Sequence, residues 1–203
     1  MAEKEEKLTS IEWMQKLKDP LSQDSEPVNV DVKLAWGNNT SVKKGAVGER
    51  IVQHYLEKRG YVIYKCITDK PHAFDLMAIK DKEIMRIAEV KSKARMPSGE
   101  TGINLSNYNE YVKILDKGGK QFDTFLFFVD EHPQEERIYG NFISALRTEI
   151  VVNNVKYPSI RTLQRDKKEV VFFHVSIMKD IRKLTQEEVA ELKKYTKRKY
   201  NYE

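Results

Sequence analysis

Two short segments, residues 74–79 and 87–93, most constrain what this chain can fold into, because each places acidic residues inside a pattern typical of a β-strand. Asp75 lies in the first segment, and Glu89 and Lys91 lie in the second. Asp75 comes fourteen positions before Glu89, which leaves room for the rest of one strand, a tight turn and an antiparallel return. The two carboxylates can therefore meet at one cation.

Side chains alternate between the two faces of a strand, so the second segment has one charged face and one apolar face. Glu89 and Lys91 project from the same face, about 7 Å apart. Ala88 and Val90 point to the opposite, apolar layer. The pattern predicts that the acid and the lysine share one pocket.

Residues 43–57 have the period of an amphipathic helix, which we expect to end at Gly60. The apolar positions form one arc, made of Val47, Ile51, Val52, Tyr55 and Leu56. At about 100° per residue, Glu49 falls at the edge of this arc, so a third carboxylate can lean over the strands. Gly45 and Gly48 lie on the arc, where they would permit close packing of the helix on a sheet.

The order of a helix with Glu49, a strand with Asp75 and a strand with residues 89–91 resembles the PD-(D/E)xK nuclease superfamily, which includes restriction endonucleases and archaeal Holliday junction resolvases. The resemblance covers residues 43–128. One departure is Phe74, which stands where the first half of the motif has proline. The resemblance implies an α/β fold, a restriction-endonuclease-like core with a mixed central sheet flanked by helices.

The resemblance also implies a metal site. Asp75, Glu89 and the backbone carbonyl of Val90 would bind Mg²⁺, a hard cation that prefers oxygen ligands, and Mn²⁺ would substitute for it. Glu49 would hold a metal-bound water or complete a second metal site, and the pattern leaves one ion and two ions open.

The activity implied by the resemblance is hydrolysis of phosphodiester bonds in DNA by an endonuclease of the restriction, repair or junction-resolving type. The metal would activate water and stabilise charge in the transition state. Lys91 would orient or help to deprotonate the attacking water. Lys93, on the same face, would contact a phosphate. Enzymes that cut two strands often pair two sites, so a homodimer is a further expectation.

Three other interpretations compete with this one. Glu89 and Lys91 alone would be an ordinary cross-strand charge pair on a solvated sheet face. A non-hydrolytic nucleic-acid-binding module could keep the same fold, although clustered acids repel phosphate and a pure binder has no need of them. A protein-interaction module with a charged sheet face is the third. Binding of Mg²⁺ or Mn²⁺ would distinguish a metal site from a solvated face.

Composition is typical of a globular protein inside the cell. The 203 residues include 33% charged and 40% hydrophobic residues, and the net charge is +5 with a pI near 9.0. No apolar run reaches membrane-spanning length, and residues 1–7 lack the apolar stretch of a signal peptide, so we expect a cytoplasmic protein that does not enter a membrane. The positive charge suits DNA as the partner and leaves RNA open.

Several residues are candidates for nucleic-acid contacts. Near the carboxyl end, five basic residues alternate with tyrosines, a composition that could grip phosphates and stack on bases, or could equally be a solvated helix end. The predicted nucleic-acid-binding residues are Lys44, Lys93, Tyr108, Lys193, Lys194, Lys197 and Arg198.

Three regions follow from the patterns: an amino-terminal helix and linker over residues 1–42, a nuclease-like core over 43–180, and a carboxyl-terminal helix and basic tail over 181–203. Within the core we expect a substrate-reaching loop over 96–102 and a helix over 105–115 that ends near Gly118 and Gly119. That helix carries Asn107, Tyr108 and Tyr111, which could line a groove or could be core residues with solvated hydroxyls. Further expected elements are strands over 122–129, 137–140 and 170–175, and a helix opened by a capping box at Thr185.

Overall fold

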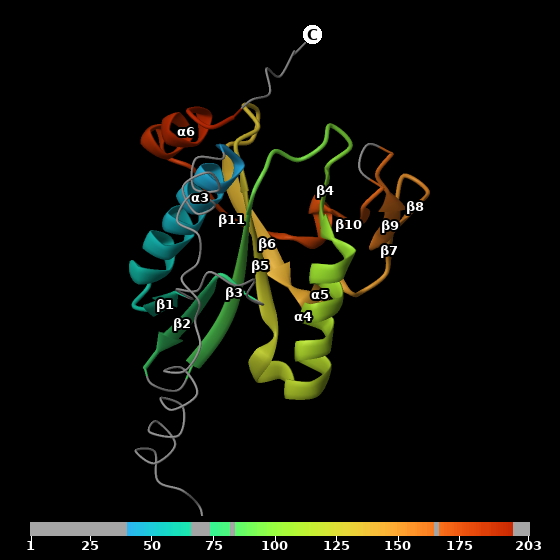
Figure 1. Ribbon diagram of the computed structural model, residues 1–203, viewed down its shortest axis with the longest axis horizontal. Coiled ribbons are helices and arrows are strands. Elements are labelled where there is room, and N and C mark those ends of the chain that lie inside the picture. The colour runs from blue at the N-terminus through green and yellow to red at the C-terminus, as the bar shows by residue number, and fades with distance from the viewer. Residues whose placement is uncertain (1–39, 66–73, 82–83, 165–166, 197–203) are drawn as a thin grey trace, which may run out of the picture. The chain divides into compact units, whose positions relative to one another are not determined.

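The computed structural model describes residues 40–65, 74–81, 84–164 and 167–196, and the fold is given for these residues (Figure 1). The helices are α3 (Thr40–Glu57), α4 (Leu105–Gly118), α5 (Ile143–Leu146) and α6 (Gln186–Lys193), with the 3₁₀ turns η2 (Lys120–Phe122) and η3 (Val175–Ile177). The predicted amino-terminal region 1–42 lies outside the described residues except for its last three positions. None of the helices built from the described residues combines the length and the apolarity that crossing a bilayer requires.

A six-stranded sheet forms the centre, with strand order β1-β2-β3-β5-β6-β11. Its strands are β1 (Val62–Lys65), β2 (Leu76–Lys80), β3 (Ile84–Ser92), β5 (Thr124–Asp130), β6 (Arg137–Phe142) and β11 (Lys179–Lys183). Strands β3 and β5 run parallel and every other neighbouring pair is antiparallel. The predicted α/β fold with a mixed central sheet flanked by helices is confirmed.

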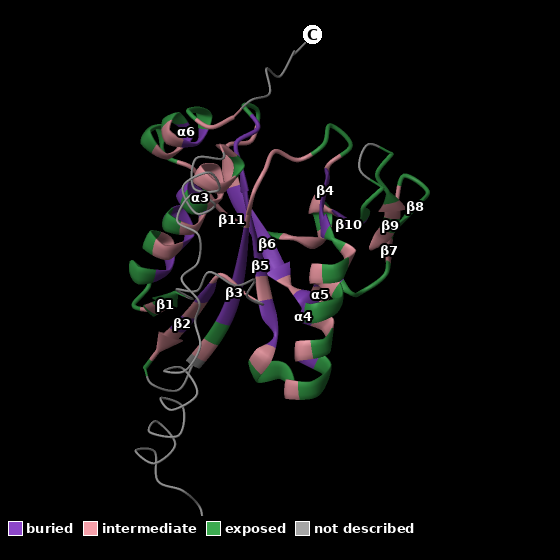
Figure 2. Cartoon of the chain, in the orientation of Figure 1, coloured by how far each residue is buried: buried purple, intermediate pink, exposed green. Residues whose placement is uncertain are grey.

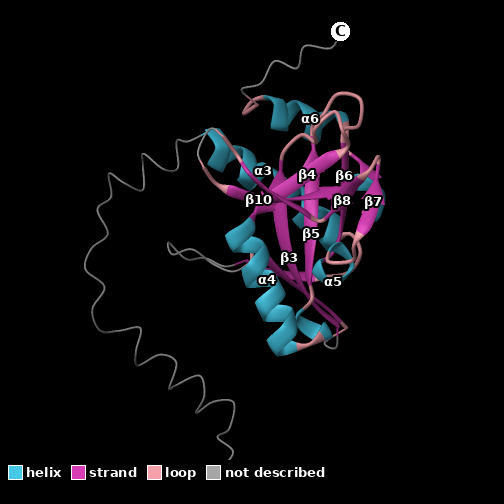
Figure 3. Ribbon diagram, turned by 90° about the vertical axis from the view of Figure 1, so that its right-hand side faces the viewer, coloured by secondary structure: helices cyan, strands magenta, loops and turns pink. Residues whose placement is uncertain are grey.

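Helices cover both faces of this sheet. On one face, the apolar arc of α3 packs with Leu192 of α6 against Ala88, Val90, Phe127 and Val129. On the other, α4 and α5 pack against Leu126 and Phe128. Figure 2 shows the resulting band of buried strands, and Figure 3 shows α4 lying beside β3 and β5. Because residues alternate along β5, this strand supplies both cores, whereas β3 supplies Ala88 and Val90 to the first.

Close packing of α3 on the sheet depends on one of the two predicted glycines. A Cβ atom built on Gly48 would lie 1.8 Å from Oγ of Ser92, at the end of β3, so only glycine fits there without movement. A Cβ atom on Gly45 would meet nothing within 4 Å, so the predicted packing role of Gly45 is wrong.

A second sheet was not anticipated from the sequence. It has the order β4-β10-β9, made of β4 (Glu100–Asn104), β10 (Glu169–His174) and β9 (Ser159–Thr162), and the chain also forms the hairpin of β7 (Ile150–Val152) and β8 (Val155–Tyr157). The expected loop over 96–102 is therefore shorter, because β4 begins at Glu100. Its turn is closed by the Gly99 amide, which donates to the Met96 carbonyl at 2.9 Å.

Glu100, a buried acid at the start of β4, links β4 to β9 through an ion pair with Arg161. Its carboxylate accepts from the guanidinium of Arg161 and the hydroxyl of Tyr157, and from Ser98 Oγ at 2.9 Å. The Arg161 guanidinium lowers the pKa of Glu100 to about 2, against the opposing effect of burial. The stabilisation is therefore present above about pH 4.5 and is lost as the pH falls toward 2.

We expect Arg161→Gln to lower the free energy of unfolding at neutral pH by about 2 kcal/mol, because it leaves a buried carboxylate without its cation. The difference between parent and variant should shrink between about pH 4.5 and 2, as measured by denaturant unfolding across that range. Arg147→Gln is the matched control, since Arg147 pairs with Asp116 at an exposed site. Equal losses at all pH values would show that the Glu100 ion pair is not the cause.

Candidate active site

Asp75 and Glu89 meet where β2 begins. Leu76 pairs with Ala88 in the β2–β3 register, so Asp75 stands opposite Glu89. The Asp75 amide donates to the Ala88 carbonyl at 3.1 Å, and Asp75 Oδ2 accepts from the Val90 amide at 2.7 Å. These bonds hold the Asp75 carboxylate against the backbone of β3.

Glu89 is a buried acid with a lysine beside it. The residue is 4% exposed, and its carboxylate pairs with Lys91 Nζ on the same strand face. Burial raises the pKa of Glu89 above its usual range; Lys91 opposes this shift, and the nearby Asp75 adds to it. The alternative of an exposed charge pair is therefore wrong for Glu89, because a solvated face would leave the acid in water. The apolar layer predicted for Ala88 and Val90 is confirmed by their burial under α3.

Tyr111 of α4 completes the surroundings of Glu89. It is 2% exposed, and its hydroxyl is hydrogen-bonded with the Glu89 carboxylate and lies in hydrogen-bonding range of Asn107. Burial raises the pKa of Tyr111 well above its usual range, and the negative charge of Glu89 raises it further. Tyr108, one turn earlier on α4, instead packs its ring on Phe173, with centroids 5.8 Å apart. Of the tyrosines on this helix, Tyr111 is the one that reaches the acids.

Glu49 lies on α3, half-buried, one position after the close contact of Gly48 with Ser92. Within the described ranges, no group of three or more His, Cys, Asp and Glu residues could hold a metal ion. Of the three predicted acids, Asp75 and Glu89 are placed opposite each other by the strand register, and the assignment of Glu49 as a third ligand stays a prediction. So does the assignment of the Val90 carbonyl.

The oxygen donors at this position fit a hard divalent cation. Asp75 and Glu89 supply carboxylate oxygens from neighbouring strands, and hard ions such as Mg²⁺ prefer such ligands and keep several waters of their own. Glu89 is buried among groups that compensate its charge incompletely, as the direction of its pKa shift indicates. A bound cation would supply the missing compensation.

Three of the predicted phosphate-binding lysines are engaged with protein groups. Lys93 Nζ donates to the Gly102 carbonyl, and Lys44 pairs with Glu131, which is 1% exposed. Lys193 pairs with Glu136 at 2.9 Å. The remaining lysine of the set in the described structure, Lys194, is exposed after α6; Lys197 and Arg198 lie outside the described residues.

Neither known protein-family profiles nor curated protein sequences match this chain. The solved structures that are similar to it include two nucleic-acid enzymes. One is Hjc, a Holliday junction resolvase from the archaeal hyperthermophile Archaeoglobus fulgidus, at 14% identity and a TM-score of 0.44, covering 70% of this chain and 99% of Hjc. The other is D212, a nuclease from a fusselovirus, at 14% identity and a TM-score of 0.37, covering 85% of this chain and 97% of D212.

Proposed function

We propose that this protein is a Mg²⁺-dependent endonuclease that hydrolyses phosphodiester bonds in DNA. One observation carries the proposal: Asp75 and Glu89 stand opposite each other on neighbouring strands, with Lys91 on Glu89. Burying an ionised acid costs free energy unless a partner compensates its charge, and such acids are common at functional sites. An acid pair can hold a divalent ion for phosphodiester hydrolysis, and an adjacent ammonium adds stabilisation of the developing negative charge.

The divalent ion, when bound, lowers the pKa of water and stabilises charge on the phosphoryl group. Asp75 is held for this role by the Val90 amide, which fixes one carboxylate oxygen. The Tyr111 hydroxyl and Lys91 hold Glu89. Lys91 is 30% exposed, so its ammonium can reach a water or a phosphate oxygen from solvent while it remains beside Glu89.

DNA is the proposed substrate class. The net charge of +5 favours a polyanion such as DNA. The superfamily that the spacing of Glu49, Asp75 and Glu89 resembles includes junction-resolving enzymes as well as restriction enzymes. Branched DNA is therefore a substrate to be tested beside linear forms.

The test is incubation of the purified chain with linear duplex, single-stranded, flapped and four-way-junction DNA, with Mg²⁺, Mn²⁺, Ca²⁺ or EDTA. We expect cleavage with Mg²⁺ and Mn²⁺ and none with EDTA. Isothermal calorimetry with Mn²⁺ alone gives an independent measure of metal binding. If the chain bound DNA but cleaved none of these substrates with any of the metals, the endonuclease proposal would be wrong, and a non-hydrolytic nucleic-acid-binding module would be the better interpretation.

A further inference from the structure

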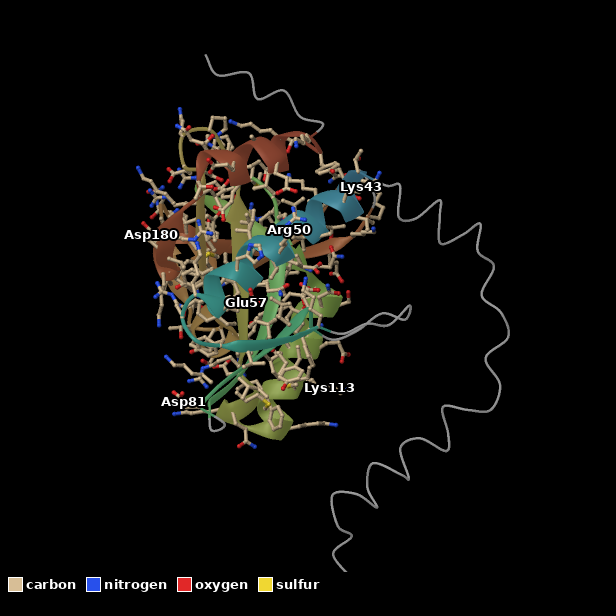
Figure 4. All side chains as sticks on the ribbon, turned by 90° about the vertical axis from the view of Figure 1, so that its left-hand side faces the viewer. Lys43, Arg50, Glu57, Asp81, Lys113 and Asp180 are labelled. Atoms are coloured by element: carbon tan, nitrogen blue, oxygen red, sulfur yellow. The ribbon has the colours of Figure 1, made fainter. Side chains whose placement is uncertain are left out.

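An aromatic pocket opens on the α3 face of the central sheet, which is the face opposite Glu89. Its volume is about 390 Å³, within the range of small-ligand sites. Its aromatic walls come from α3, the segment after it, β5 and β6, and consist of Tyr55, Tyr61, Phe125, Phe127 and Phe142. Figure 4 shows this face, with Glu57 at the end of α3 and Asp180 on β11.

Three of the rings contact one another in a row. Phe125 lies between Phe127 and Phe142, with ring centroids 4.5 Å and 4.9 Å away. Phe125, Phe142, Tyr55 and Tyr61 are each only partly buried. Phe125 and Phe142 stand at 82° to each other, so the rings line a pocket and do not share one plane. Because aromatic faces that reach solvent are costly for the protein alone, the pocket suits a flat ligand that lies against one of these rings.

Three cations are among the residues that line the pocket: Arg59 after α3, Arg86 on β3 and Lys179 on β11. The Arg59 guanidinium lies 4.4 Å from the centroid of the Tyr55 ring. Arg86 and Lys179 lie 5.9 Å and 5.8 Å from that of Phe142. All three residues are exposed, so they can contact an anionic group outside the pocket.

Arg59 and Arg86 differ from the other arginines in the described part of the chain. Each of the others has a carboxylate partner; these are Arg50, Arg95, Arg137, Arg147, Arg161 and Arg182. Arg59 and Arg86 have none among the described residues, and both line this pocket. Asp180 is the acid among the lining residues, and it is bonded to Arg137 at 2.6 Å. The pocket therefore keeps a positive charge.

We propose that this pocket binds a nucleotide of single-stranded DNA, with the base against the Phe142 ring and the flanking phosphates on Arg59, Arg86 and Lys179. Stacking platforms surrounded by cations are the physical requirement for holding an unpaired strand. Arg86 precedes Glu89 by three positions, so its side chain projects from the opposite face of β3. The pocket is a second site, distinct from the cleavage site, and its occupancy needs no metal.

The test measures binding of a fluorescent oligothymidylate and of a duplex of equal length in EDTA, which keeps cleavage out of the measurement. The double variant Arg59→Gln, Arg86→Gln should bind the single strand about tenfold more weakly and the duplex nearly as before. Its slope of log affinity against log salt should become shallower by about 1.4, or about 0.7 for each lost phosphate contact. Arg147→Gln, which removes an exposed arginine with a carboxylate partner, should change neither value.

A base-specific arm uses Phe142→Leu and an oligonucleotide with abasic positions. The parent should lose about tenfold in affinity on the abasic strand, and the variant should show little further loss. Thermal unfolding checks the fold of each variant, and the arginine variants carry the test if Phe142→Leu is unstable.

Equal losses on single strand and duplex, or the same loss in Arg147→Gln, would overturn the proposal. If free thymidine monophosphate competed for the pocket as strongly as the unlabelled oligothymidylate does, the proposal would be overturned in favour of a mononucleotide site. Because no step requires catalysis, failure of the endonuclease proposal leaves this test intact.

Discussion

Replacing Glu89 with glutamine should abolish metal-dependent cleavage of DNA, with a loss on the order of 10³-fold or more, while the fold and most of the DNA affinity remain. The exchange removes one anionic ligand with little change in volume. Glutamine can keep a hydrogen bond with Tyr111, and Lys91 is exposed enough to be solvated after losing its partner. Because the pKa of Glu89 is already raised by burial, a neutral side chain is tolerated at this position.

The measurement is the single-turnover rate on the best DNA substrate of the parent, with DNA affinity and thermal unfolding measured in parallel. Affinity should stay the same or rise, since a charge that repels phosphate is removed. Asp75→Asn should behave alike, because an amide oxygen can still accept from the Val90 amide. Glu110→Gln, at an exposed acid next to Tyr111 on α4, is the matched control. Cleavage by Glu89→Gln at the parent's rate would remove the metal-ligand role.

Lys91→Ala should slow the cleavage step by on the order of 10²-fold and leave DNA binding nearly unchanged. The reason is position: Lys91 Nζ is bound to Glu89 and still reaches solvent, so it can act on the attacking water or on the developing charge. The experiment compares the single-turnover rate at saturating enzyme with Mg²⁺ and the affinity in Ca²⁺, which suppresses the chemistry. A variant that loses affinity alone and cuts bound DNA normally would show that Lys91 only binds phosphate.

Lys93→Ala provides the comparison within the same strand face. Lys93 donates to the Gly102 carbonyl, so its removal affects the link between the end of β3 and β4. We expect a modest loss of affinity, with cleavage of bound DNA continuing. A slowed cleavage step in Lys93→Ala, equal to that of Lys91→Ala, would mean that the two lysines cannot be assigned separate roles.

Much of the fold was predictable because the patterns concerned are local. The apolar arc after Lys43 predicted α3, and the structure extends that helix back to Thr40. The strand that follows Asp75, the strand with Glu89 and their antiparallel pairing are present as predicted. So is the capping box at Thr185, whose hydroxyl accepts from the Glu188 amide at 3.3 Å.

The second sheet could not be read in the same way. Strand β9 is short, and β4 follows a turn whose residues are typical of a loop. In this sheet β4 pairs with β10. Ile103 therefore lies opposite Val171, although the two residues are far apart in the sequence. Contacts of that kind leave little local pattern, because each strand is stabilised by partners that the sequence does not place beside it.

Local patterns were enough to predict that Glu89 and Lys91 share a strand face with Asp75 opposite, because alternation along a strand and the length of a hairpin are local rules. The surroundings of these residues came from tertiary packing alone. Packing placed Tyr111, and not Tyr108, on Glu89, and it engaged Lys93 with β4. It also gathered two arginines and a set of aromatic rings from α3, β3, β5 and β6 into one pocket. Burial and side-chain pairing depend on which distant elements pack together, and the spacing of residues along the chain does not specify this packing.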